Sequence, residues 1–334
     1  MRHTSSLANR SRMSLLGLLA ILACLGTASA QLGTTNSKYG TNAPAVVNFG
    51  MVDPNPQQIY YNADYSTGGA ALRNQLQRSI VISGGINPAG GAQAAWIYWS
   101  VLGPLSGASG VVTVQRLWPN PGTSPTTTPP IHGQPIAIGA DPCWGSNGNH
   151  IYRAGLPTSV VTGNGNYLVQ FGVGAGGLSN GADPWLGPVI PPLIEGAALV
   201  VIRKGTNTVT IFDGQAGITF DAMATYTLNL PTPTSGGTVL WDNIGADGQL
   251  GKSRDAYVAS ETTTINACQV AGPLAIGSDT DSDWNGSSGL PLPQLFDVTG
   301  HDITCAAPAG TTALNVVFQS QGDCLTTIAN VVSQ

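Results

Sequence analysis

The sequence predicts an all-β fold, an antiparallel two-sheet sandwich that is jelly-roll-like, with long loops and little helix. Short runs rich in Val, Ile, Tyr and Phe recur along the 334 residues, and Gly, Pro, Asn or Asp bounds each run, as expected for strands and turns. The 44 Gly and 23 Pro residues punctuate the chain, and no heptad or fixed-period repeat is present. Because no Pro/Ser-rich linker divides the strand-bearing region, we expect a single sandwich domain over residues 59–334.

The stretch from His150 to Asp213 carries the clearest strand signals. It contains three apolar runs, Tyr167–Val173, Ala197–Arg203 and Thr208–Phe212. The last two runs are joined by Lys204-Gly205-Thr206-Asn207, in which Gly and Asn can supply the positive φ of a tight turn. We therefore expect these two runs to form a hairpin.

Four more strands are expected before this stretch, at Ser79–Ser83, Ala94–Val101, Val111–Leu117 and Pro135–Gly139. In Ala94–Val101 both alternating faces are apolar, which predicts a central strand covered on both sides. Residues 119–130 form a Pro/Thr-rich loop that cannot be a central strand. The one short helix that the pattern favours is Ala70–Gln77, where Leu72 and Leu76 are four residues apart.

Five strands are expected in the last third of the chain, at Ala224–Leu230, Thr238–Trp241, Thr262–Val270, Ala313–Phe318 and Leu325–Val332. The last two flank Gln319–Cys324, and we expect them to form a closing hairpin.

The N-terminus has the parts of a secretory signal peptide. Three Arg residues precede an apolar run from Leu15 to Leu25, and an Ala-x-Ala site ends at Ala30. Residues 1–30 are therefore predicted to be a signal peptide and residues 31–58 a loose N-terminal arm, with no transmembrane segment after cleavage and a secreted, extracellular location. The alternative is a lipid anchor through Cys24, since Ile21-Leu22-Ala23-Cys24 resembles a lipoprotein box.

Composition limits the classes of partner. Removing residues 1–30 takes away three Arg and no acid, which leaves 9 basic and 17 acidic residues and a net charge of −8. Such a chain lacks the clustered basic face that binding nucleic acid requires. Charged residues make up only 9% of the sequence, against about 25% in ordinary soluble domains. The expected partners are surface glycans or other surface proteins.

Four cysteines remain after signal cleavage, at Cys143, Cys268, Cys305 and Cys324. An even number in an exported chain predicts two disulfides, and the absence of Cys-x-x-Cys spacing argues against zinc and redox motifs. Four cysteines allow three connectivities, and the sequence does not choose among them.

Five motifs stand out along the chain: AAWIYWS at Ala94–Ser100, Tyr152–Val169, EGAALVVI at Glu195–Ile202, TVTIFDG at Thr208–Gly214, and Phe296–Val332. Together they resemble a poorly characterised group of secreted β-sandwich domains on bacterial and archaeal cell-surface proteins. The resemblance spans most of residues 75–332, and it departs at Gly155-Leu156-Pro157, where a DVT-like turn is expected. It implies a sandwich fold and export, and it brings no catalytic residue.

Catalytic motifs are sparse. Gly177–Gly181 matches G-x-S-x-G around Ser179, but no helix follows it, so a nucleophile elbow is not expected. The mature chain has three histidines, at positions 132, 150 and 301, without metal-ligand spacing. Glu195 leads directly into a strand and has no paired carboxylate. No catalytic residue is therefore assigned, and a secreted hydrolase is the weakest alternative.

Two loop features suggest ligands. Large aromatic side chains lie among Pro, Gly or Asp at Trp118, Trp144, Trp185 and Trp284, where they either stack on sugar rings or pin loops to the sandwich. Asp279, Asp281 and Asp283 alternate in a polar loop, so one Ca²⁺ is the candidate cofactor, with none as the other possibility. Because Leu290 stands where an EF-hand needs its bidentate Glu, a full EF-hand is excluded.

From these features we expect a secreted, disulfide-bonded β-sandwich that acts as a non-enzymatic surface or extracellular structural or adhesive protein. The alternative is a carbohydrate-binding module that uses the four loop tryptophans.

Overall fold

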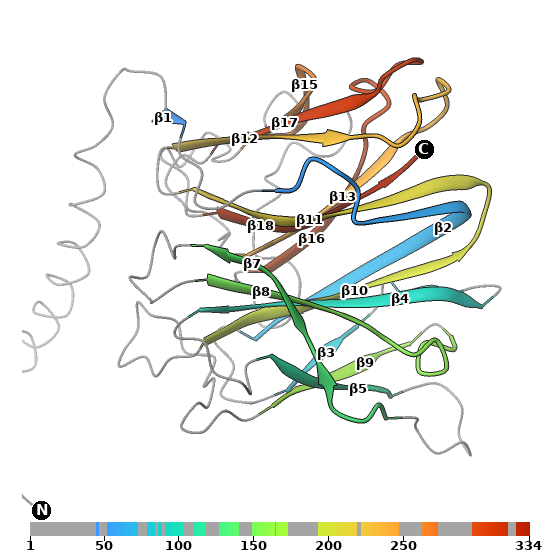
Figure 1. Cartoon of the computed structure of the whole chain (residues 1–334), viewed down its shortest axis with the longest axis vertical. Coiled ribbons are helices and arrows are strands. Elements are labelled where there is room, and N and C mark those ends of the chain that lie inside the picture. The colour runs from blue at the N-terminus through green and yellow to red at the C-terminus, as the bar shows by residue number, and fades with distance from the viewer. Residues whose placement is uncertain are drawn as a thin grey trace, which may run out of the picture. The chain divides into compact units, whose positions relative to one another are not determined.

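The structure is a computed structural model. It describes residues 45–46, 52–72, 79–83, 86–88, 91–102, 110–117, 127–139, 149–163, 165–172, 193–218, 222–246, 262–272, 296–319 and 325–334. Every regular element in these ranges is a strand, so the predicted all-β fold is confirmed (Figure 1). In this part of the chain there is no helix with the length and hydrophobicity that a membrane crossing requires.

The strands form three hydrogen-bonded sheets. The nine-stranded sheet has the order β16 (Phe296–Asp302), β13 (Leu240–Ala246), β18 (Leu325–Ser333), β11 (Asn207–Ile218), β2 (Gln58–Ala71), β10 (Leu193–Lys204), β4 (Ala92–Leu102), β8 (Asn149–Gly155) and β7 (Gln134–Gly139). The five-stranded sheet has the order β1 (Ala45–Val46), β12 (Ala222–Asn229), β17 (Ala313–Gln319), β14 (Thr262–Ile265) and β15 (Cys268–Ala271). The four-stranded sheet has the order β3 (Ser79–Ile82), β9 (Tyr167–Phe171), β5 (Val111–Arg116) and β6 (Ile131–His132). Among the strand pairs described, β1 with β12 is parallel and the others are antiparallel.

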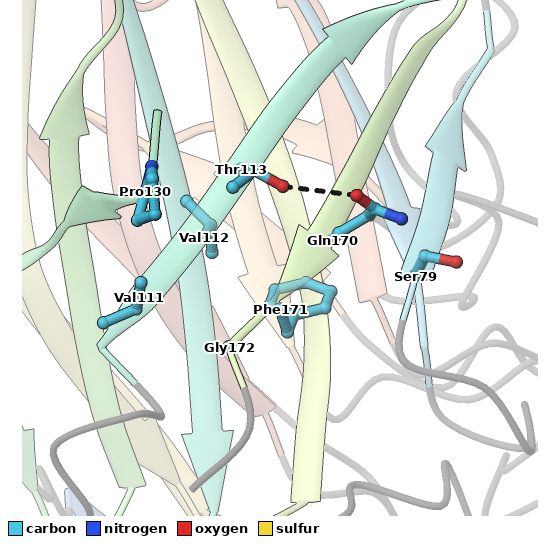
Figure 2. A pocket seen from close by; sticks show the side chains of 8 residues that line it. All are labelled: Ser79, Val111, Val112, Thr113, Pro130, Gln170, Phe171 and Gly172. Atoms are coloured by element: carbon cyan, nitrogen blue, oxygen red, sulfur yellow. Dashed lines mark hydrogen bonds between the residues drawn. The ribbon is translucent and has the colours of Figure 1, made fainter. Parts of the chain in front are cut away.

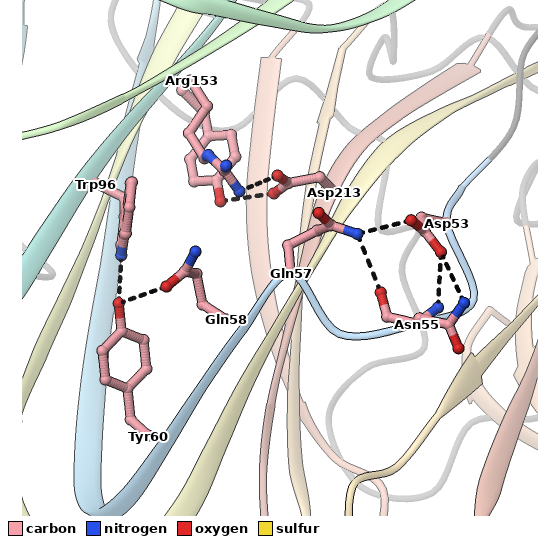
Figure 3. Close-up of polar contacts among 9 residues, drawn as sticks. Asp53, Asn55, Gln57, Gln58, Tyr60, Trp96, Arg153 and Asp213 are labelled. Atoms are coloured by element: carbon pink, nitrogen blue, oxygen red, sulfur yellow. Dashed lines mark hydrogen bonds and ion pairs between the residues drawn. The ribbon is translucent and has the colours of Figure 1, made fainter.

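Strand β2 folds the nine-stranded sheet into two layers. Its first part, Gln58–Tyr60, is antiparallel to β11, and its second part, Ala63–Ala71, is antiparallel to β10. Lys204 at the end of β10 and Asn207 at the start of β11 both pair with Ala63, so β2 must reverse direction there. Asn62 supplies the turn with a φ of 52°, and Asn tolerates this left-handed region better than most residues. Figure 3 shows the strand folding back on itself below Tyr60.

The result is four layers, and therefore two sandwiches. The first inner layer consists of β7, β8, β4, β10 and the second part of β2, and it packs through one apolar core against the four-stranded sheet. The second inner layer consists of the first part of β2 with β11, β18, β13 and β16, and it packs through another core against the five-stranded sheet. A third core lies between the two inner layers, with Val200 from β10 and Val331 from β18 among its members. The expected two-sheet sandwich is thus present twice.

Strand β4 confirms one prediction in detail. Ile97, Trp99 and Val101 belong to the core of the first sandwich, while Tyr98 faces the core between the inner layers. Both faces are buried, as the apolar alternation in Ala94–Val101 predicted, because a sheet lies on each side of this strand.

Both predicted hairpins are wrong. Ala197–Arg203 and Thr208–Phe212 are strands joined by a tight turn, but β2 lies between them and pairs with both. At the end of the chain, β17 pairs with β12 and β14 in the outer sheet, whereas β18 pairs with β11 and β13 in the inner layer. The chain therefore changes layer between these two strands.

Other predictions need smaller corrections. The helix expected at Ala70–Gln77 does not begin at Ala70, since Ala70 and Ala71 end β2 and residues 73–78 lie outside the described residues. Thr262–Val270 forms two strands, because Asn266 and Ala267 adopt φ values of 45° and 66° and make a two-residue turn. The region predicted as an N-terminal arm contributes β1 and a bridge between Val52 and Gly214.

Candidate functional site

A pocket of about 360 Å³ lies at one end of the four-stranded outer sheet, where β3 and β5 begin and β9 ends (Figure 2). The described lining residues are Ser79, Val111, Val112, Thr113, Pro130, Gln170, Phe171 and Gly172. Val112 and Phe171 are cross-strand partners that point into the core of the first sandwich. The Thr113 hydroxyl group donates a long hydrogen bond of 3.4 Å to Oε1 of Gln170.

A buried ion pair joins the two inner layers (Figure 3). Arg153 of β8 donates from Nη1 to Oδ2 of Asp213 of β11, and the two side chains are 12% and 6% exposed. The fully buried Tyr98 of β4 donates to the other carboxylate oxygen, Oδ1, at 2.8 Å. A carboxylate with charge-assisted hydrogen bonds on both oxygens is well satisfied despite its burial.

An aromatic side chain lies against the guanidinium group of Arg153. Its Cζ atom lies 5.0 Å from the ring centroid of Trp96, within the range of a cation–π contact. The indole Nε1 of Trp96 donates at 2.7 Å to the hydroxyl oxygen of Tyr60, which is carried by the first part of β2. Tyr60 thereby connects the second inner layer to β4, and we call Arg153, Asp213, Tyr98, Trp96 and Tyr60 the cationic joint.

A second carboxylate connects the same two layers, and within the described residues it accepts hydrogen bonds from hydroxyl groups. Asp242 of β13 accepts hydrogen bonds from the hydroxyl groups of Tyr65, at 2.6 Å, and Thr67, both on the second part of β2. Its cross-strand partner is Gly300, where an added Cβ would lie 2.7 Å from Oδ1 of Asp242. A larger residue at position 300 would therefore have to displace this carboxylate. We call Asp242, Tyr65 and Thr67 the neutral joint.

Burial shifts the pKa values in both joints. Burial raises the pKa of Asp213 above its ordinary value, although Arg153 and Tyr98 oppose the shift. Burial likewise raises the pKa of Asp242, against the hydrogen bonds from Thr67 and Tyr65 and the charge of His301. The pKa values of Tyr65 and Tyr98 are raised by burial and then by the neighbouring carboxylates, so both phenols stay protonated donors.

The second sandwich has its own polar and covalent ties. Oδ1 of Asn330 in β18 accepts hydrogen bonds from the Tyr226 hydroxyl group of the outer sheet and from the Trp241 indole. Cys268 at the start of β15 is bonded to Cys305, which follows β16, with Cα atoms 6.2 Å apart. This disulfide confirms the predicted oxidation of two cysteines, and it links the outer sheet to the second inner layer.

Three of the candidate catalytic residues that lie within the described residues are buried. Glu195, His150 and His301 are buried, with exposed fractions of 0%, 4% and 7%. His132 is exposed in β6. The described residues contain no group of three His, Cys, Asp or Glu side chains that is able to hold a metal ion.

The remaining candidates lie outside the described residues: Ser179, the tryptophans Trp118, Trp144, Trp185 and Trp284, the acidic loop Asp279, Asp281 and Asp283, and the cysteines Cys143 and Cys324. The predicted signal peptide at 1–30 lies outside them as well. The carbohydrate-binding and calcium hypotheses that rest on these loops stay predictions.

Neither joint was predicted from the sequence. One signal was available, because Arg153 and Asp242 are charged residues within strands of a chain with only 9% charged residues. A charge inside an apolar strand needs a partner in the fold. The partner itself has no local signature, since Arg153 and Asp213 are 60 residues apart and Tyr65 and Asp242 are 177 apart.

No protein-family model matches the sequence, and no curated protein is similar to it at a significant level. Among solved structures, BuGH86 in complex with neoagarooctaose is similar with a TM-score of 0.25 and 10% identity, covering 87% of this chain and 34% of that chain. A variant of BuGH86 in the same complex gives the same values. N-glycanase F (PNGase F) gives a TM-score of 0.24 and 11% identity, covering 81% of this chain and 95% of that chain.

This chain spans about a third of the length of BuGH86. At such TM-scores the likenesses carry no argument about fold family, activity or ligand. The comparisons assign no family to the chain.

Proposed function

We propose that this protein is a secreted, non-enzymatic structural or adhesive component of the cell surface or extracellular space. The observation that carries the proposal is that the two buried carboxylates, in the cationic and neutral joints, hold the two inner layers together. Asp213 and Asp242 are both held by donors from the opposite layer, so they serve to bind one sandwich to the other. Groups committed in this way contribute rigidity rather than proton transfer to a substrate.

Three further features support the same role. The Cys268–Cys305 disulfide is typical of an oxidising compartment and agrees with the predicted signal peptide. A surface poor in charged residues agrees with an extracellular setting. The buried positions of Glu195, His150 and His301 leave these side chains out of reach of a macromolecular substrate.

Labelling with activity-based probes tests the non-enzymatic part of the proposal. The full chain, expressed in a host that exports it, is treated with fluorophosphonates and with mechanism-based glycosidase inhibitors. We expect no stoichiometric labelling by either class. Labelling by a fluorophosphonate that Ser179→Ala abolishes would overturn the proposal and establish the hydrolase alternative.

Localisation tests the other part. We expect the processed protein in the medium or on the outer surface of the exporting cell, with its N-terminus at Gln31. Retention in the cytoplasm with an intact N-terminus would contradict the proposal. A protein retained in the membrane fraction that Cys24→Ala releases would instead establish the lipid-anchored form.

A further inference from the structure

The pocket on the four-stranded sheet has a row of uncharged polar groups at its mouth (Figure 2). Ser79, Gln170 and Thr113 are direct cross-strand partners on β3, β9 and β5, so their side chains share the outer face of the sheet. Within the described residues, the Ser79 hydroxyl group and the amide nitrogen of Gln170 have no protein partner. A hydroxyl group and an amide are therefore free to bind a ligand.

Apolar groups form the rest of the lining. Val111 is half-buried and Pro130 is exposed, while Val112 and Phe171 close the floor from the core side. A ligand at this position meets hydrogen-bonding groups on one side and carbon atoms on the other. The ligand must therefore have hydrogen-bonding groups on one side and an apolar surface on the other.

Charge narrows the class of ligand. None of the described lining residues is ionisable, and the next row on the same face, Val81, Leu168 and Gln115, is also uncharged. A charged ligand would lose water here without gaining a counter-charge, which is costly. The described part of the lining therefore favours a neutral ligand.

We propose that this pocket binds the ring of a neutral sugar residue. The hydroxyl groups of the sugar bond to Gln170, Ser79 and Thr113, and the C–H face of the ring packs against Val111 and Pro130. A pocket of about 360 Å³ lies within the ~300–1,000 Å³ range of small-molecule sites. The proposal goes beyond the structural role above, because a scaffold needs no ligand at this position, and it does not use the loop tryptophans.

Ligand-detected saturation-transfer NMR tests the proposal on the full mature protein. The probes are the methyl glycosides of glucose, galactose and mannose, with glucuronic acid and glucosamine as charged counterparts. We expect binding of at least one neutral glycoside with a millimolar Kd, and weaker binding of both charged sugars. No transfer to any neutral glycoside, or tighter binding of a charged sugar, would overturn the proposal.

Two matched variants locate the site. Gln170→Ala should weaken binding by about fivefold or more, because one net hydrogen bond contributes about that factor. Gln115→Ala, on the same face of neighbouring β5 but outside the lining, should leave the Kd unchanged. Gln170 is exposed, so both variants should fold, and Ser79→Ala provides a second test of the lining. Binding that Gln170→Ala and Ser79→Ala leave intact would place the sugar elsewhere and refute this site, without affecting the structural role.

Discussion

Asp213 and Asp242 both connect the second inner layer to the first, yet one is bonded to a guanidinium group and the other accepts hydrogen bonds from two hydroxyl groups of the described residues. Asp213 accepts from Arg153 and Tyr98, whereas Asp242 accepts from Tyr65 and Thr67. In the cationic joint two charges are taken out of water and offset each other. In the neutral joint the carboxylate of Asp242 is buried without a guanidinium group bonded to it within the described residues, and burial favours its protonated form although the charge of His301 opposes this.

Each joint is therefore destabilised by a different change. The cationic joint depends on both Arg153 and Asp213, because either charge alone would be buried without a counter-charge. The neutral joint depends on its hydroxyl donors and on pH. The predictions below test this distinction.

The largest effect is expected when the cation is removed. Arg153→Met leaves the Asp213 carboxylate buried without its counter-charge, and breaking such a pair typically costs about 3–5 kcal/mol. Urea unfolding followed by tryptophan fluorescence measures the loss. The double variant Arg153→Met/Asp213→Asn removes both charges but keeps an acceptor for Tyr98, so it should recover most of the stability. A double variant as unstable as Arg153→Met would show that Arg153 acts through packing on Trp96 rather than through charge.

The disulfide offers a comparison between covalent and electrostatic ties. Cys268 and Cys305 are 37 residues apart, and a loop of that length predicts a stabilisation of about 4 kcal/mol at most, with about 2–4 kcal/mol typical. The variant Cys268→Ser/Cys305→Ser should lose this amount in urea unfolding. Its effect should add to that of Arg153→Met, because the two sites share no described partner. Strong non-additivity would mean that loosening the second sandwich also opens the cationic joint.

The same disulfide selects one connectivity for the predicted second bond. If all four mature cysteines are oxidised, Cys143 must pair with Cys324. Counting thiols in the unfolded, unreduced protein should give none. Peptide mapping that finds Cys143 or Cys324 as a free thiol would contradict the predicted second disulfide.

Removing one phenol from each joint compares them directly. Tyr65→Phe leaves Asp242 with Thr67 as its remaining described donor, so it should cost about 1.5–3 kcal/mol, the range for hydrogen bonds to charged groups. Tyr98→Phe should cost less, since Arg153 still offsets Asp213. Tyr61→Phe is the control, because that side chain is 59% exposed. Equal losses for Tyr65→Phe and Tyr98→Phe would remove the distinction between the joints.

Local pattern predicted most of the strands but not β2, β8 or β16, and it predicted the partners of the strands poorly. The apolar alternation of Ala94–Val101 predicted a strand buried on both faces, because that information is contained in the strand itself. The insertion of β2 between β10 and β11 depends on a reversal at Asn62, where one positive φ redirects the chain. A single Asn in a run of strand-forming residues is not enough to predict such a turn.

For the candidate sites too, the sequence predicted what depends on a local pattern and missed what depends on the fold. A cysteine count predicted oxidation, but the partner of Cys268 came from the fold. The pocket row of Ser79, Gln170 and Thr113 joins residues from three strands whose register the sequence does not encode locally. The joints likewise depend on the approach of two layers, including contact at Gly69, where an added Cβ would lie 2.5 Å from Val298. Such contacts are properties of the assembled layers.

The smallest expected effect is the contribution of Asp242, in the neutral joint, to the pH dependence of stability. Because burial raises the pKa of Asp242 above its ordinary 3.8, the folded protein binds this proton more tightly than the unfolded chain does. The stability that the protonated acid contributes is fully present below 3.8 and is lost as the pH rises through the folded pKa. Lowering the pH from about 7 toward 4 should therefore raise this contribution. The gain is about 1.4 kcal/mol for each unit by which the pKa of Asp242 is higher in the folded protein than in the unfolded chain.

Asp242→Asn isolates that contribution, since Asn keeps an acceptor for Tyr65 and cannot titrate. Melting curves of both proteins across this pH range should diverge, with the wild type gaining stability relative to the variant as the pH falls. Other carboxylates cancel in the difference, including the exposed Asp302, whose pKa is lowered by the Thr304 hydroxyl group and backbone N–H and which has the opposite sign. Asp302→Asn is the matched control and should change the pH dependence little. Parallel curves for the wild type and Asp242→Asn would contradict the prediction, because they would mean that folding does not change how tightly Asp242 binds its proton.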